Sequence, residues 1–146
     1  MLHLHSGLRL LILLFLLAAI VKSLVGWLGK KPFKKADNLI AIILVSLVHT
    51  QAIVGIVVYA MSDMVKAGLA DMGAAMKNPG LRFWTVEHAL MMVAVVVLVT
   101  IGRAKSKKAS TYELKHKKGV IFYSIALVIV VWGGVIKPFA LGRGWF

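Results

Sequence analysis

Four long apolar stretches limit the fold of this chain more than any other feature. They run from about residue 4 to 28, 39 to 61, 83 to 101 and 120 to 136. A bilayer core about 30 Å thick requires roughly 20 apolar residues of α-helix. Because each stretch reaches or approaches that length, an all-α integral membrane protein is predicted. The fourth stretch is short, so we expect it to extend into Pro138 and Phe139 or to tilt little.

The composition excludes a small soluble domain. Hydrophobic residues make up 60% of the 146 residues, and the mean hydropathy is +0.89. A chain of this length cannot bury so much apolar surface in one soluble core, so lipid must cover much of it. There is no glycine-rich phosphate loop and no pair of carboxylates, which disfavours a soluble enzyme. Residues 1–146 are predicted to form a single domain, with the first stretch as a retained helix rather than a signal peptide.

The basic residues cluster on one side of the predicted helices, and the net charge is +13. Twelve of the 18 Lys and Arg residues flank the first and third connections: Lys22, Lys30, Lys31, Lys34, Lys35, Arg103, Lys105, Lys107, Lys108, Lys115, Lys117 and Lys118. The other six, on the opposite side, are Arg9, Lys66, Lys77, Arg82, Lys137 and Arg143. The positive-inside rule predicts that both termini lie outside the cytoplasm. Its basic loops then meet anionic lipid headgroups rather than nucleic acid.

The connections between the stretches predict an antiparallel bundle of four transmembrane helices. Gly29 and Pro32 separate the first helix from the second, and Asp37 or Asn38 is suited to cap the second helix. The second connection, residues 62–82, is different because apolar residues recur there at helical spacing among charged ones. This pattern predicts a short amphipathic helix on the outer surface.

Glu87 and His88 lie side by side just inside the third apolar stretch, where charge is costly. A charge at the centre of a membrane helix costs roughly 2.5 to 3.5 kcal/mol on insertion scales, so such groups usually face a partner, a cofactor or water. The pair is predicted roughly 5 to 8 Å below the outer end of its helix. His5 and Arg9 lie at a similar depth on the first helix, on one face because four residues separate them. These four polar groups are predicted to converge.

The remaining histidines are placed differently. His49 lies about 16 Å into the second helix, near the midplane, and roughly 10 Å from the height of His88. Shifts of a few residues in the helix boundaries would remove more than half of that gap. Taken alone, His49 is expected to bond to a neighbouring helix rather than to ligate a metal. His3 and His116 lie near the predicted interfaces, where we expect them to be solvated.

Histidines aimed inward from facing helices are the ligands that a b-type haem requires in a helical bundle. The chain has no cysteine, which excludes thiolate metal sites and covalent haem attachment. Arg9 and Arg82 are suited to bind haem propionates, and Glu87 is expected to pair with either arginine. The candidate cofactor site therefore comprises His88, His49, His5, Arg9, Glu87 and Arg82, with the three histidines as candidate metal ligands. No catalytic residue is assigned.

Several motifs occur in a specific order along nearly the whole chain. They are Leu4-His5-Ser6 with Leu8-Arg9, His49-Thr50-Gln51 with Gly55 and Tyr59, Arg82-Phe83-Trp84 with Glu87-His88 and Met91-Met92, and Ile101-Gly102-Arg103 with Lys105 to Lys108. This order resembles that of small four-helix inner-membrane proteins of Bacteroidetes, often labelled cytochrome b-like. Where members of that group carry a Pro-Trp-Pro-Phe-like segment, this chain has Ile136-Lys137-Pro138-Phe139.

The resemblance implies an integral-membrane haem b protein that transfers electrons, to or from membrane quinone, with its site in the outer half of the bundle. His88 is then the leading ligand, with His49 and His5 as competing partners. Arg9 and Glu87 would orient or neutralise the groups around it. Electron transfer is favoured over catalysis on a substrate of its own, and a homodimer or a larger membrane complex is a further expectation.

Two other functions stay open. A cofactor-free structural or accessory subunit of a larger membrane complex would use the polar cluster only to hold helices together, at about 0.6 kcal/mol per hydrogen bond. A proton or ion pathway would run from the outer face to the midplane through Glu87, His88, Arg9 and His49. Against that pathway, no acidic residue continues it through the cytoplasmic half of the bundle.

Overall fold

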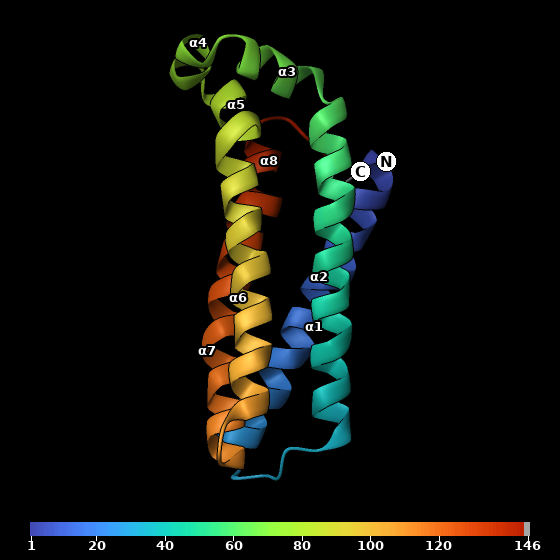
Figure 1. Ribbon diagram of the computed structural model, residues 1–146, viewed down its shortest axis with the longest axis vertical. Coiled ribbons are helices and arrows are strands. Elements are labelled where there is room, and N and C mark those ends of the chain that lie inside the picture. Colours follow the sequence, from blue (N-terminus) through green and yellow to red (C-terminus); the bar gives the residue numbers. More distant parts are fainter. Residues whose placement is uncertain (145–146) are drawn as a thin grey trace.

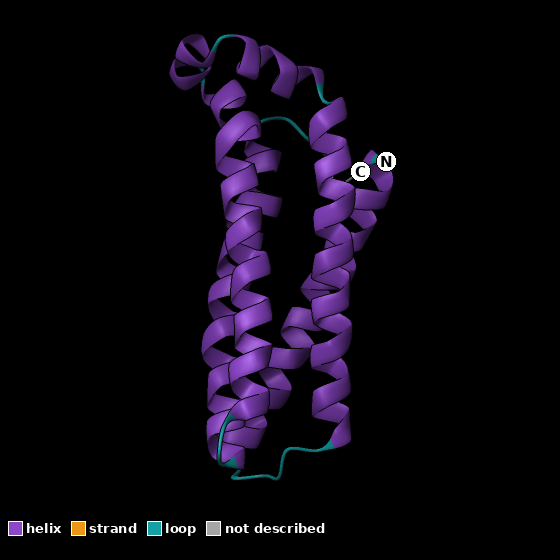
Figure 2. Ribbon diagram, in the orientation of Figure 1, coloured by secondary structure: helices purple, strands orange, loops and turns teal. Residues whose placement is uncertain are grey.

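The computed structural model describes residues 1–144, which are helical along nearly their whole length. Four helical runs are long and apolar enough to cross a membrane: Leu2–Leu28, Lys35–Met61, Pro79–Lys108 and Tyr112–Ala140. No strand occurs in the described residues (Figure 2). The four predicted helices are therefore confirmed, and each extends beyond its apolar stretch at one or both ends.

Two of the long runs are continuous α-helices and two contain a widened turn. The first two are α1 (Leu2–Leu28) and α2 (Lys35–Met61). The third consists of α5 (Pro79–Arg82), the π-helical turn η1 (Phe83–Glu87) and α6 (His88–Lys108). The fourth consists of α7 (Tyr112–Val131), the π-helical turn η2 (Trp132–Ile136) and α8 (Lys137–Ala140). Pro138 and Phe139 thus lengthen the fourth run, as its short apolar stretch predicted.

The long helices lie side by side (Figure 1). α1 packs against α2 and α7, and α6 packs against the same two helices. A thin apolar core between them includes one fully buried residue from each: Leu16, Leu44, Val99 and Ala126. Large apolar side chains on the outside remain exposed on each helix, for example Leu14, Ile56, Leu90 and Val128. The apolar residues therefore face outward as well as inward.

The connection from α2 to α5 forms two short helices rather than the single amphipathic helix that was predicted. α3 (Asp63–Ala70) and α4 (Met72–Lys77) cross one end of the molecule (Figure 1). Asp71 divides them because its Oδ1 accepts a hydrogen bond from the Ala74 N–H at 2.9 Å and so caps α4. Ser62 caps α3 in the same way through the N–H of Val65.

Candidate functional site

His88 lies where the two π-helical turns meet. Its backbone N–H bonds to the carbonyl of Phe83, five residues earlier, and closes η1. Its side-chain Nδ1 donates to the Gly133 carbonyl of η2 at 3.0 Å. Because a carbonyl oxygen only accepts, Nδ1 carries the proton, and in the neutral ring Nε2 carries the lone pair. No hydrogen bond to Nε2 is formed within residues 1–144.

The widening of η2 has a local cause in Pro138. Proline has no N–H to donate to the carbonyl four residues earlier, here that of Gly134, and its ring crowds that carbonyl. The turn instead closes through the Lys137 N–H, which bonds to the Trp132 carbonyl five residues back. The Gly134 carbonyl accepts from Arg9 Nη1 of α1 at 2.8 Å. Both carbonyls that hold site side chains therefore come from a widened turn, a feature often found at functional sites.

His5 approaches His88 from α1. The ring centroids lie 6.3 Å apart, with the ring planes at 70°. Gln51 of α2 holds His5, because its Nε2 donates to the His5 carbonyl at 2.9 Å and lies 3.4 Å from the His5 Nε2. Gly55, one turn further along α2, leaves room for the ring, since a Cβ there would lie 3.2 Å from its Cε1. Side chains of α1, α2 and α6 thus meet at the histidine pair.

Two arginines flank this pair. Besides Arg9, the site contains Arg143, which follows α8 in a segment that returns toward the N-terminal end of α1 (Figure 1). The guanidinium carbon of Arg143 lies 4.7 Å from the ring centroid of Trp84. Both arginines are close enough to act electrostatically on His5 and on His88. Basic groups are therefore concentrated around the two imidazoles.

Aromatic side chains and the α3 helix cover the site. The ring centroids of Phe83 and Trp84 lie 5.6 and 5.5 Å from that of His88. Tyr59 Oη of α2 donates to the Thr85 carbonyl of η1 at 2.7 Å. A Cβ at Gly68 of α3 would lie only 2.0 Å from the Thr85 Oγ1, so α3 packs directly on η1.

The structure does not bring every predicted site residue to the histidine pair. Glu87 pairs with Arg82, whose Nε lies 2.6 Å from the Glu87 Oε1, and both side chains are more than a third exposed. Arg82 also donates to the Met76 carbonyl of α4 at 3.1 Å. The pair thus ties the third long run to the outer connection, and Arg143 takes the place beside His88 that was expected for Arg82.

His49 lies apart from His88. Its Nε2 is 2.9 Å from the Thr100 Oγ1 of α6, which confirms the expected bond to a neighbouring helix. Thr100 follows His88 by twelve residues, or about 18 Å of helix. The separation exceeds the roughly 10 Å expected from the apolar stretches. His5, and not His49, is the histidine beside His88.

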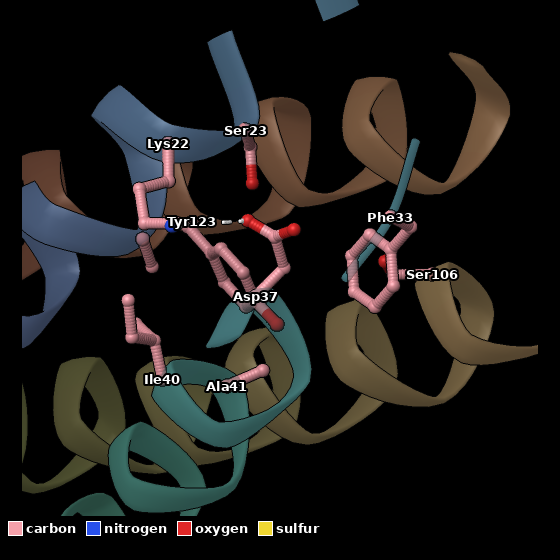
Figure 3. A pocket seen from close by; sticks show the side chains of 9 residues that line it. Lys22, Ser23, Phe33, Asp37, Ile40, Ala41, Ser106 and Tyr123 are labelled. Atoms are coloured by element: carbon pink, nitrogen blue, oxygen red, sulfur yellow. Dashed lines mark ion pairs between the residues drawn. The ribbon is translucent and has the colours of Figure 1, made fainter. Parts of the chain in front are cut away.

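A second polar cluster occupies the basic end of the molecule. Lys22 of α1 and Asp37 of α2 form an ion pair at 3.7 Å (Figure 3). They line a cavity of about 10 Å³ together with Ser23, Ser106 and Tyr123. A cavity of that volume holds about one water molecule. The cluster therefore has no room for a larger ligand.

His116 lies near this cluster, and the prediction that it is solvated is wrong. Only 1% of the residue is exposed. Its Nε2 donates to the Lys31 carbonyl at 3.2 Å, and its ring centroid lies 5.3 Å from that of Phe33. The ring fits against α1 because Gly26 has no side chain; a Cβ there would lie 2.4 Å from the ring.

No protein-family model, curated protein or solved structure matches the chain. The site is therefore interpreted from its own residues. Residues 1–144 contain no group of three or more His, Cys, Asp or Glu side chains arranged to hold a metal ion.

Proposed function

We propose that this protein is a multi-pass protein of a bacterial inner membrane, folded as an antiparallel four-helix transmembrane bundle with both termini in the periplasm. The length of the four helical runs and their exposed apolar side chains support insertion in a bilayer. The basic residues beside the α1–α2 and α6–α7 connections support the orientation. A relationship to the small Bacteroidetes proteins labelled cytochrome b-like is part of the proposal.

Within this bundle, His5 and His88 are proposed to hold a b-type haem for electron transfer, with membrane quinone as a redox partner. The observation that carries this proposal is the 6.3 Å between the two ring centroids. Because the two imidazoles come from different helices and lie this close together, both would be placed to hold one haem iron. When bound, a haem of this type supplies one-electron chemistry.

The ring nitrogens fit this role. The Gly133 carbonyl fixes His88 with its Nδ1 protonated, which leaves the Nε2 lone pair for a metal. Metal-bound histidines commonly donate their other N–H to a backbone carbonyl in this way. The Nδ1 of His5 is buried and has no hydrogen-bond partner within residues 1–144. Because the amide nitrogen of Gln51 only donates to the His5 Nε2, the neutral ring carries its proton on Nδ1, and a metal would bind Nδ1 once this proton is lost or moved to Nε2.

The basic and aromatic side chains around the pair fit the rest of a haem. Arg9 and Arg143 are suited to its carboxylate groups, since guanidinium groups form strong hydrogen bonds with carboxylates. Phe83 and Trp84 provide apolar surface beside His88 that would exclude water. The cavity lined by Lys22 and Asp37 and the one lined by Val45 and Arg103 lie elsewhere. The side chains around the pair would therefore have to move apart to admit a haem.

The test is haem titration of the purified protein in detergent, followed by absorbance. We expect a Soret band and a reduced-minus-oxidised α-band that are lost in His88→Ala and weakened or lost in His5→Ala. The control is His49→Ala, which should bind like the wild type because His49 lies about 18 Å along the helix from His88. Absence of any spectral change on adding haem to the wild type would refute the proposal.

A cofactor-free accessory subunit is the second candidate, and one observation favours it. His88, Arg9 and Tyr59 each bond to a carbonyl of a π-helical turn, so the cluster also joins four helices without any ligand. Such a subunit would co-purify with larger membrane proteins and give no haem spectrum. The ion pathway gains no comparable support, because the gap of about 18 Å between His88 and His49 interrupts the expected relay.

A further inference from the structure

A groove opens between α2 and α6 at the basic end of the molecule, away from the histidine pair. Its volume is about 350 Å³. The groove is lined by Val45, Thr100, Arg103, Ala104, Lys107 and Lys108. The lining from α6 includes three basic residues toward the end of that helix, and its two aliphatic side chains are Ala104 of α6 and Val45 of α2. The groove thus combines an apolar floor with a cationic end.

The three cations of the groove are available to an anion. Arg103 Nη1 donates to the Asn38 Oδ1 of α2 at 3.0 Å, which holds the guanidinium group across the groove. A guanidinium group has five N–H donors, so four remain for another partner. Lys107 and Lys108 are exposed in the last turn of α6. No carboxylate within residues 1–144 forms an ion pair with any of the three.

We propose that this groove is a binding site for an anionic phospholipid of the bilayer. Its phosphate would lie among Arg103, Lys107 and Lys108, and an acyl chain would lie along Val45 and Ala104. A soluble phosphate would gain nothing from the apolar floor, whereas a lipid uses both parts. Basic pockets between helices on the cytoplasmic side are suited to anionic headgroups. The proposal rests on the membrane placement proposed above but not on haem.

The test is a titration of the full chain in detergent with phosphatidylglycerol or phosphatidylcholine, read by native mass spectrometry. We expect tighter binding of phosphatidylglycerol by the wild type. The triple variant Arg103→Gln/Lys107→Gln/Lys108→Gln should bind phosphatidylglycerol roughly a hundredfold more weakly. The matched control, Lys30→Gln/Lys31→Gln/Lys34→Gln, removes the same charge at the same end outside the groove. It should weaken binding by less than about threefold, since screening limits distant charges.

A second variant tests the apolar part of the groove. Ala104→Trp keeps all the cations but fills the floor, so it should also weaken phosphatidylglycerol binding, and glycerol phosphate without acyl chains should not compete. Equal losses in the two triple variants, or unchanged binding in Ala104→Trp, would overturn the proposal in favour of general charge attraction. Failure of the wild type to fractionate with membranes would instead refute the membrane placement. Haem spectra are independent of both results.

Discussion

His88 and His116 are held in the same way at opposite ends of the molecule, yet their surroundings differ. Each donates one ring N–H to a backbone carbonyl of another segment, that of Gly133 or Lys31. His116 is enclosed by packing at its end, with only 1% of its surface exposed. His88 instead faces a second imidazole, that of His5, with the two ring centroids 6.3 Å apart. The hydrogen bond to a carbonyl is therefore common to both histidines, whereas the second imidazole distinguishes the surroundings of His88.

The largest expected effect separates these two histidines. His88→Ala should abolish haem binding and should also lower the thermal midpoint of the apoprotein, because it leaves the Gly133 carbonyl without its hydrogen bond. His116→Ala should preserve the haem spectrum but destabilise the protein by about 2 to 4 kcal/mol, because it removes a buried ring and leaves the Lys31 carbonyl unpaired. Absorbance and thermal unfolding in detergent measure both quantities. Loss of the haem spectrum in His116→Ala as well would remove the distinction between the two ends.

The next effect tests how His5 is positioned. Gln51→Leu removes the donor that bonds to the His5 carbonyl and should weaken haem binding by about 10- to 100-fold, as is typical for groups that orient a ligand. Thr100→Val is the control, because Thr100 contacts only the distant His49 among these groups. Haem affinity unchanged in Gln51→Leu would show that the orientation of His5 is set elsewhere.

The smallest effect tests why His116 is buried. Gly26→Ala adds a Cβ 2.4 Å from the His116 ring, so the ring must move, and we expect a loss of about 1 to 3 kcal/mol of stability. Gly7→Ala in the same helix has open space around its Cβ and should stabilise α1 by up to about 1 kcal/mol. Equal midpoints for the two variants would contradict the close packing at Gly26.

The long helices and part of the site follow from local rules. Stretch lengths predict four helices, and counting residues from the helix ends correctly places His5 and Arg9 at a depth similar to that of His88. The expectation for His116 failed because its burial depends on Gly26, which is 90 positions away in the sequence. The predicted location of His116 near the membrane interface does not indicate whether its ring contacts another helix. The small residue Gly26 could have indicated a site for the His116 ring. The sequence alone does not show that these two residues lie opposite each other, because that depends on how the helices align.

Other features of the site depend on tertiary packing. The turn η2 could be suspected from Pro138, since the carbonyl four residues earlier must find another donor, but the sequence does not say that Arg9 supplies it. Either Arg9 or Arg82 was expected to pair with Glu87. The ion pair forms with Arg82, which is five residues away in the sequence. Arg143 lies outside the apolar stretches, so depth assignment gave no reason to place it beside His88.

The most direct test of the central claim is the spin state of the ferric protein reconstituted with haem, measured by electron paramagnetic resonance. If His5 and His88 both bind the haem iron, the wild type should give a low-spin signal, and His5→Ala should give a high-spin signal. A wild type that takes up haem but remains high-spin, or that keeps its low-spin signal in both His5→Ala and His88→Ala, would contradict ligation by this histidine pair.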